Sequence, residues 1–240
     1  MTAPDVASVH GGAKSERPRR TRTGPDGVDP SQVLDIGAIP EIAGGSHRSP
    51  FPPIADYAFL SDCETTCLIS SAGSVEWLCV PRPDSPSVFG ALLDRSAGHF
   101  RLGPKGVSVP AARRYLPGSL ILETTWQTHT GWLIVRDALV MGPWHDVGSR
   151  SPTHHRTPMD WDAEHTLLRT VRCVSGTVEL VVNCAPSFDY HRVGASWEYC
   201  GPAYGEAVAS AQNHPDTHPK LRLTTNLRLG IEGREAHART

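Results

Sequence analysis

Pairs of short apolar segments, each joined by a turn that contains glycine, recur along the chain after Phe51. They are 66–70 with 75–80, 120–128 with 132–140, and 167–174 with 178–184. Glycine permits the positive φ that tight hairpin turns need, so each pair is predicted to form two antiparallel strands. Several hairpins of this kind in one chain predict a mainly β fold, an antiparallel sandwich or barrel.

Two segments near the C-terminus follow other patterns. At 221–229, apolar and polar residues alternate, which predicts a half-buried strand with Arg222 and Arg228 on its solvated face. At 202–212, apolar residues recur at the spacing of a helix face, which favours a helix. These residues are Tyr204, Ala207, Val208 and Ala211.

The first 49 residues differ from the rest in composition. All six cysteines and every Trp, Tyr and Phe lie after Pro50, whereas residues 1–50 hold six prolines and seven glycines. A segment without large apolar side chains cannot offset its loss of conformational entropy. We therefore expect 1–49 to be a disordered basic tail and 50–240 to be the folded domain. The basic run from Lys14 to Arg22 could contact nucleic-acid phosphates, but a solvated tail is the simpler interpretation.

Composition argues against several classes of protein. Hydrophobic residues are 39% of the chain, and with glycine included the apolar fraction is that of an ordinary globular protein. The formal net charge of -2 gives no general attraction to nucleic acid or membranes. No apolar run approaches the ~18 residues of a transmembrane helix. Six cysteines without a secretory signal predict reduced thiols and a cytoplasmic location.

The segment 142–165 is a long connection rich in histidine and aspartate. Its notable residues are Trp144, His145, Asp146, His154, His155, Asp160, Trp161, Asp162 and His165. Three interpretations stay open: a polar surface loop, a contact surface for another domain, and a metal site. The spacing fits no tight metal motif, and Cys63 and Cys67 lack a second matched pair, so no metal ligand is assigned. Cys67 and Cys79 are interpreted as small buried hydrophobes in strands.

The strongest local signal lies between Pro53 and Leu93. The strand expected at 75–80 leads into residues 81–86, which read Pro-Arg-Pro-Asp-Ser-Pro. Three prolines restrict the backbone here, so the loop presents Arg82 and Asp84 with little entropy to lose. A stiff loop that carries charges off a sheet suits recognition. Alternatively, Arg82 and Asp84 pair with each other and lock the loop.

This segment resembles the N-terminal domain of the bacterial trehalase and glucoamylase-like proteins of glycoside hydrolase family fifteen. The resemblance extends from about Pro52 to the C-terminus. It includes 115–119, the tryptophans of the 120–140 hairpin, and 167–180. The most specific part is 77–89, although the family pattern has Phe where this chain has Pro83. The likeness is strongest to actinobacterial α,α-trehalases, cytoplasmic enzymes that split trehalose into two glucoses.

The resemblance implies a β-supersandwich that is followed by an (α/α)6 catalytic barrel. In inverting glycosidases of this kind the acid and base carboxyl groups lie about 6.5–9.5 Å apart, and the family carries both in the barrel. The sequence ends at Thr240 before any run of paired amphipathic helices, so we expect the barrel to be absent and the chain to be inactive alone. No catalytic residue is assigned. Some relatives need phosphate and magnesium, for which no ligand can be assigned in this chain.

The resemblance also suggests that a loop of the sandwich reaches the barrel's substrate pocket, and 77–89 is the candidate. There Arg82 would donate paired hydrogen bonds to sugar hydroxyls or a carboxylate. Asp84 would accept from a hydroxyl or orient Arg82, and Trp77 would offer an apolar face to a pyranose ring. The alternative is that these three residues serve only in packing or in the interface between domains.

Three functions follow from these patterns. The first, which we expect, is the noncatalytic N-terminal domain of a trehalase-type glycosidase; its partner is a barrel domain or chain, and its substrate trehalose or another α-glucoside. The second is a free-standing carbohydrate-binding module that uses Trp144, Trp161 or Trp197 as sugar platforms. The third binds nucleic acid or a protein through the basic tail. Without its barrel, the docking surface would be exposed, which predicts poor solubility or a homo-oligomer.

Overall fold

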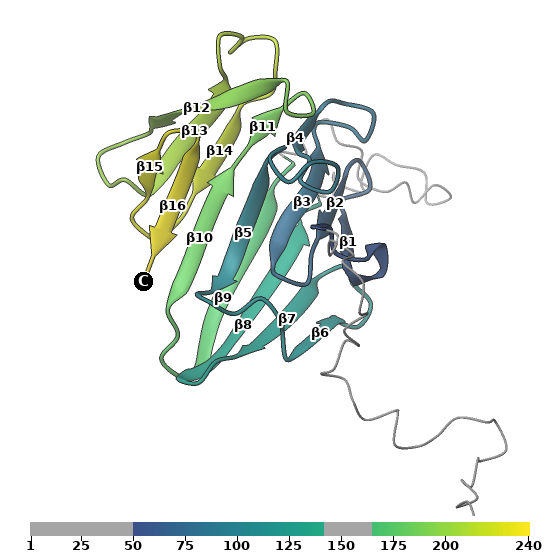
Figure 1. Cartoon of the computed structure of the whole chain (residues 1–240), viewed down its shortest axis with the longest axis vertical. Helices are drawn as coiled ribbons and strands as arrows, with labels where there is room; N and C mark the ends of the chain where they lie inside the picture. Colours follow the sequence, from purple (N-terminus) through teal and green to yellow (C-terminus); the bar gives the residue numbers. More distant parts are fainter. Residues whose placement is uncertain (1–49, 142–164) are drawn as a thin grey trace, which may run out of the picture. The chain divides into compact units, whose positions relative to one another are not determined.

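A computed structural model describes residues 50–141 and 165–240 of the chain. The predicted tail 1–49 and most of the 142–165 segment lie outside these described residues. Within the described ranges the chain forms β-strands and one short 3-10 helix, η2 (Ile54–Asp56), and contains no α-helix. The prediction of a mainly β fold is therefore confirmed (Figure 1).

The largest sheet has eight strands, in the order β1-β2-β3-β5-β10-β16-β15, with β4 paired to β3. They are β1 (Ala58–Ser61), β2 (Thr66–Ile69), β3 (Ser74–Cys79), β4 (Ser87–Phe89), β5 (His99–Pro104), β10 (Leu180–Ala185), β15 (Gly230–Glu232) and β16 (Glu235–Arg239). Every pair in this sheet is antiparallel.

Two further sheets have four antiparallel strands each. One runs in the order β6-β7-β8-β9 and the other in the order β11-β12-β13-β14. The strands are β6 (Ala112–Tyr115), β7 (Leu122–Gln127), β8 (Gly131–Leu139), β9 (Leu167–Gly176), β11 (Ser187–Phe188), β12 (Val193–Tyr199), β13 (Glu206–Ala211) and β14 (Leu221–Thr224).

The sheet β6–β9 packs face to face on the large sheet, behind it in the view of Figure 1. Trp126 of β7 is fully buried between the two layers. Its indole lies against Gly73 and Gly103, where a Cβ atom would come within 3.2 Å and 3.7 Å of the ring. Small residues on one layer thus make room for the largest side chain of the other, as close-packed interiors require. The predicted antiparallel sandwich is confirmed.

Two of the three predicted hairpins are present, and the third is wrong. Strands β2 and β3 pair with each other, as do β7 and β8. Strand β9, however, pairs with β8, whereas β10 pairs with β5 and β16 in the other layer. The predicted turn at Ser175–Thr177 does not reverse the chain within one sheet, because Gly176 continues the β8 ladder opposite Gly131. The chain then crosses from one layer to the other.

The predicted helix at 202–212 is also wrong, because this segment contains strand β13. Ala207, Ala209 and Ala211 are buried at alternate positions. This two-residue period is that of a strand with one buried face. The strand predicted at 221–229 is confirmed in part, since pairing ends at Thr224. Arg222 and Arg228 lie on the surface as expected, Arg222 with Glu206 at 2.8 Å and Arg228 over the Tyr204 ring.

Candidate functional site

The loop 81–87, between β3 and β4, carries the charges that sequence analysis singled out. Arg82 Nε donates to Asp84 Oδ1 at 3.0 Å, and both side chains are largely exposed, at 70% and 75%. Two further hydrogen bonds close the loop: the Ser85 amide donates to the Arg82 carbonyl at 3.0 Å, and the Arg82 amide donates to Ser85 Oγ at 3.1 Å. The Val80–Pro81 peptide bond is cis. Arg82 and Asp84 therefore pair with each other, as one of the two interpretations expected.

Trp77 lies behind this loop. Its half-buried ring stacks at a tilt against Tyr190, with ring centroids 6.3 Å apart. The Tyr190 amide donates to Ser87 Oγ at 3.2 Å, and the Tyr190 hydroxyl lies 3.5 Å from the Ser85 carbonyl. Tyr190, in the segment 189–191, thus contacts both Trp77 and the loop 81–87, although it is more than a hundred residues away in the sequence.

The segment 189–191 has a backbone that sequence analysis did not anticipate. Asp189, Tyr190 and His191 have φ of 49°, 54° and 73°, three consecutive non-glycine residues in the left-handed region. Each such residue costs roughly 1–2 kcal/mol unless its side chain compensates. Asp189 and His191 belong to residue types that adopt this region more often than most, whereas Tyr190 gives no such sequence signal. Strain of this kind is often found at functional sites, which draws attention to the surface around Tyr190.

A cavity of about 240 Å³ adjoins the same segment. Its polar lining consists of Arg95, Ser96, His99, Ser187, His191, Arg234 and Glu235. His191 Nδ1 lies 3.0 Å from Ser187 Oγ, and the Arg234 guanidinium lies over Gly194, where a Cβ would come within 2.7 Å of it. Donors and acceptors of both charges meet here, an arrangement that suits hydroxyl groups better than a single ion.

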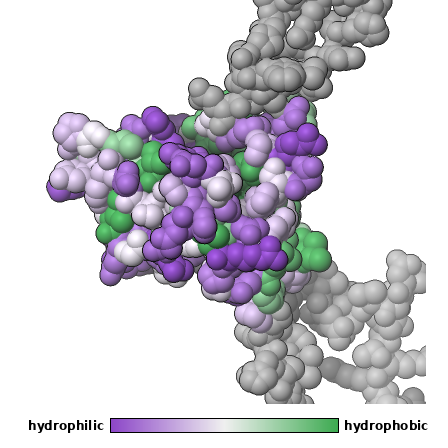
Figure 2. All heavy atoms as spheres, turned by 90° about the horizontal axis from the view of Figure 1, so that it is seen from above, coloured by the Kyte–Doolittle hydropathy of each residue, from purple (hydrophilic) through white to green (hydrophobic). Residues whose placement is uncertain are grey.

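Figure 2 looks onto the end of the sandwich that lies at the top of Figure 1, where the loops around β4 gather. Hydrophilic residues cover most of this surface, and hydrophobic residues form small, separate patches. A surface of this kind favours contacts with polar groups over burial of a large apolar ligand.

Two buried glutamates of the described residues, Glu76 and Glu123, have lowered pKa values. Glu76, almost fully buried, accepts from Arg95 Nη2 at 2.9 Å and from the Tyr57 hydroxyl at 2.6 Å. Burial alone would raise the pKa of Glu76, but these hydrogen bonds lower it below its ordinary value. The pKa of Glu123 is likewise lowered, by hydrogen bonds from Arg114 and Arg136. A general acid needs the opposite shift, so neither glutamate is suited to protonate a leaving group.

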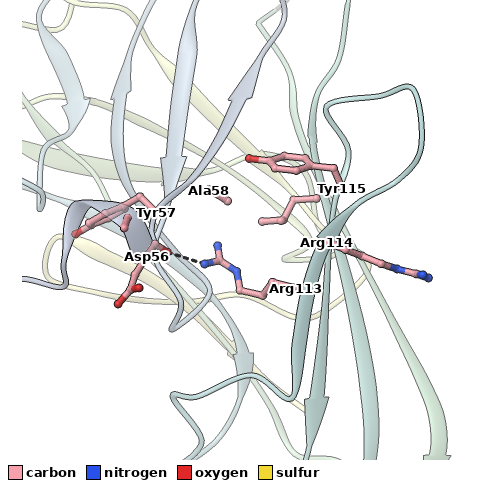
Figure 3. Close-up of a pocket in the computed structure, with 8 residues that line it drawn as sticks. Asp56, Tyr57, Ala58, Arg113, Arg114 and Tyr115 are labelled. Carbon is pink, nitrogen blue, oxygen red and sulfur yellow. Dashed lines mark hydrogen bonds between the residues drawn. The ribbon is translucent and has the colours of Figure 1, made fainter. Parts of the chain in front are cut away.

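A second hollow, of about 170 Å³, lies between η2 and β6 (Figure 3). Arg113 extends into it and donates to the carbonyls of Asp56 at 2.6 Å and Ile69 at 2.9 Å, whereas Arg114 points away. The Tyr115 hydroxyl bonds both the amide and the carbonyl of Phe59, at 2.8 Å and 2.9 Å. These side chains tie β6 to the large sheet, and the polar groups of this hollow serve the fold.

Comparison with known proteins relates part of the sequence to a family. Residues 47–139 match the family described as "Trehalase-like, N-terminal". The chain contains a trehalase-like N-terminal domain. Residues Trp77, Arg82 and Asp84 lie inside the matched region of this domain, whereas Tyr190 and the cavity beside it come from the chain that follows.

Full-length relatives of the trehalase-like domain are much longer than this chain. The protein named "Trehalase" in Mycolicibacterium smegmatis is 84% identical over 202 residues, which are 84% of this chain and 30% of the relative. "Trehalase" of Mycobacterium tuberculosis is 82% identical over 193 residues, 80% of this chain and 28% of the relative. "Trehalase 1" of Sulfolobus acidocaldarius is 37% identical over 84 residues, 35% and 15% of the two chains. No solved structure matches.

The structure also places several other residues that the sequence analysis singled out. Cys67 and Cys79 are buried in strands, as expected, and burial raises the pKa of both thiols. Trp197 is buried, with Nε1 donating to the Arg234 carbonyl at 2.9 Å, so it offers no sugar platform. Trp144 and Trp161 lie outside the described residues, as do the histidines and aspartates of that loop except His165. His165 Nδ1 lies 3.5 Å from Asp62 Oδ2.

The described part of the chain offers no fitting site for magnesium or phosphate, the two groups that the resemblance implies. In the ranges 50–141 and 165–240, no three His, Cys, Asp or Glu residues gather to hold a metal ion such as magnesium. The cavity beside His191 does not fit phosphate well, because Arg95 is already bonded to Glu76 and the Glu235 carboxylate shares the lining. No helix among the described residues is long and apolar enough to cross a membrane.

Proposed function

We propose that this chain is the noncatalytic N-terminal part of a trehalase, an enzyme that hydrolyses trehalose to glucose in a separate (α/α)6 domain. The identity to two mycobacterial trehalases, 84% and 82% over four fifths or more of the chain, carries this proposal. The chain spans about 30% of the length of those relatives, and the catalytic chemistry is assigned to the remainder. The free cysteines support a reducing, cytoplasmic setting.

The electrostatics of the sandwich support its noncatalytic role. Inverting hydrolysis needs one carboxyl group that stays protonated and a second that stays ionised about 6.5–9.5 Å away. Glu76 and Glu123 are instead paired with arginines that lower their pKa, and Asp137 is paired with Arg169 at 2.8 Å. These three groups stabilise the fold, and the acid and base belong to the other domain.

The loop 81–87 is proposed to border the trehalose pocket of the complete enzyme. Its backbone is fixed by the Arg82–Ser85 hydrogen bonds and supported by Trp77 and Tyr190, so little entropy is lost on binding. The ion pair orients the planar guanidinium of Arg82 while using only its Nε atom, and the terminal amino groups remain for sugar hydroxyls. Asp84 positions Arg82, and Trp77 holds the loop from behind.

The test is a chimera in which this chain replaces the matching region of the M. smegmatis trehalase. Arg82→Ala in the chimera should lower kcat/KM for trehalose by about tenfold or more, while the melting temperature changes little, because an exposed ion pair contributes only about 0–1 kcal/mol to stability. Arg222→Ala is the matched control, since Arg222 is equally exposed and ion-paired but lies on β14. Equal kcat/KM values for the two variants would contradict the proposal that the loop 81–87 borders the trehalose pocket.

The isolated chain gives a second, independent test. We expect calorimetry with trehalose or maltose to show little or no heat, because a carbohydrate pocket would be completed only by the catalytic domain. Strong binding by the chain alone would instead indicate a free-standing carbohydrate-binding module.

A further inference from the structure

Strand β9 (Leu167–Gly176) is the longest strand among the described residues and lies at an edge of its sheet. Every residue from Thr170 to Gly176 is exposed. Its neighbour β8 alternates between buried and exposed residues, as a sandwich strand should. The lack of alternation in β9 means that both faces of its second half, as well as its outer edge, are open to solvent.

Edge strands β1 and β6 are protected, whereas the edge of β9 is interrupted only by the register shift after Cys173. Edge strand β1 is covered by the Tyr115 hydroxyl, which bonds the amide and the carbonyl of Phe59. Edge strand β6 has only four residues and carries Arg113 and Arg114. Strand β9 has ten residues without proline or lysine, and it exposes Leu168, Val171 and Val174 at 49%, 36% and 50%. A long, apolar, exposed edge is a template for pairing with another strand.

The hydrogen bonds of β9 show which of its backbone groups are free. The Val140 amide donates to the Thr166 carbonyl at 2.9 Å, so residue 166 faces β8. Because the direction of the N–H and C=O groups alternates along a strand, those of residues 167, 169, 171 and 173 face away from β8. The described residues form no ladder on that side of β9. A second strand could therefore bind there without breaking any existing pair.

We propose that the free edge of β9 pairs antiparallel with β9 of a second copy of this chain, around a two-fold axis at Val171. In this register Val171 lies opposite its own copy, within the regular stretch of β9 that precedes the register shift of the β8–β9 ladder after Cys173. Thr170 lies opposite Arg172, so no two like charges face each other. The two four-stranded sheets would join into one continuous sheet, an isologous interface of the kind that two-fold symmetry requires.

Charge and hydrophobicity select this register over its neighbours. A shift by two residues in one direction places Arg172 directly opposite Arg172 of the copy, which is destabilising. A shift in the other direction places Leu168 opposite Arg172. All three registers use the free odd-numbered amides, but only pairing at Val171 sets a valine against a valine and places no arginine opposite an arginine or a leucine. The observations thus favour self-pairing, independently of any function in trehalose hydrolysis.

The first test is sedimentation velocity on the 240-residue chain from about 5 to 200 µM, a range suited to a small interface of this type. We expect a reversible dimer. Val171→Lys places two charges at the two-fold axis and should raise the dimer dissociation constant by about tenfold or more. Val109→Lys is the matched control, a valine that is exposed in a loop away from β9, and should dimerise like the parent chain. Circular dichroism confirms that both variants are folded.

The second test keeps the proposal falsifiable if Val171→Lys does not fold. In a chain with Cys63→Ser and Cys173→Ser, Val171→Cys should form a disulfide-linked dimer on mild oxidation, because paired Cα atoms across such an axis lie about 5.5 Å apart. Val109→Cys in the same background should not. A parent chain that stays monomeric over the whole range, a Val171→Lys chain that still dimerises, or equal cross-linking at positions 171 and 109 would each overturn the proposal.

Discussion

Asp137 and Arg169 form the most buried ion pair of the described residues, with 1% and 3% of their side chains exposed. Arg169 also donates to the carbonyls of Phe100 at 2.7 Å and Gly73 at 2.8 Å, both in the facing layer, and lies over the Phe100 ring. One guanidinium therefore satisfies polar groups of both sheets at once. A buried charge is tolerated only where its partners are complete, so this group specifies how the two layers meet.

Replacing Arg169 by an apolar residue tests how much this ion pair contributes to stability. Arg169→Met leaves the Asp137 carboxylate buried without its partner, and we expect the free energy of unfolding to fall by about 3–5 kcal/mol. Arg172→Met, on the same strand but exposed, should change it by less than about 0.5 kcal/mol. Urea denaturation followed by fluorescence measures both. A loss for Arg169→Met as small as that of the control would show that the pair contributes little to layer packing.

The buried Glu76 carboxylate, which accepts hydrogen bonds from Arg95 and Tyr57, should make the stability of the fold depend on pH. Folding lowers the pKa of Glu76 below its ordinary value of 4.5. The stability that ionised Glu76 contributes is therefore complete above the unfolded-state pKa, and it is lost as the pH falls through the folded-state pKa. The urea midpoint should therefore decline as the pH falls below about 4.5. Glu76→Gln should be less stable at neutral pH and should show a shallower decline. An unchanged slope in the variant would assign the acid sensitivity to other carboxylates.

At the scale of elements, local patterns predicted strands and turns but not always their partners. The glycine-containing turns correctly gave the β2–β3 and β7–β8 hairpins, because adjacent segments and a permissive turn suffice for a hairpin. The β9–β10 connection has the same local signature, yet it crosses between layers, and nothing in its own residues distinguishes a reversal from a crossing. In β13, alanines fit a helix face and a strand face equally well, and the neighbouring strands decided.

The local features of the candidate site were predictable from the sequence, whereas its long-range contacts were not. Prolines and charges identified the loop 81–87, and the pairing of Arg82 with Asp84 was one of the two interpretations of that loop. The contribution of Tyr190 was missed, because its contact with Trp77 joins residues more than a hundred positions apart. The left-handed backbone of 189–191 is imposed by its surroundings rather than by its residue types, so only tertiary structure shows it.

The layer crossing after β9 depends on a glycine whose role can be isolated. Gly176 has φ of 69°, and a Cβ atom there would overlap the Thr130 carbonyl oxygen. Gly118 has nearly the same φ, 70°, but nothing lies within 4 Å of its Cβ position. Gly118→Ala should therefore cost about 1–2 kcal/mol for the backbone alone, and Gly176→Ala clearly more. Equal losses in thermal or urea denaturation would mean that the close approach to Thr130 relaxes freely.

At the scale of the whole molecule, the described sandwich has a complete two-layer core, whereas the catalytic acid and base are proposed to lie in another domain. Glu76, Glu123 and Asp137 are paired with arginines, whereas the polar end surface and the edge of β9 remain available for contacts. This division matches the proposed role as the front part of a trehalase, since a domain that only positions and supports needs a rigid interior and open surfaces. We expect the same open surfaces to favour self-association of the isolated chain.

The division of labour predicts complementation between separate chains. This chain alone and the remainder of the M. smegmatis trehalase alone should each release little or no glucose from trehalose, because one lacks the acid and base and the other lacks the surface that completes the pocket. Mixing or co-expressing them should restore release, and Arg82→Ala should weaken that restoration while Arg222→Ala should not. Glucose release by this chain alone would place catalytic groups within the sandwich, and full activity of the remainder alone would make the sandwich dispensable for turnover.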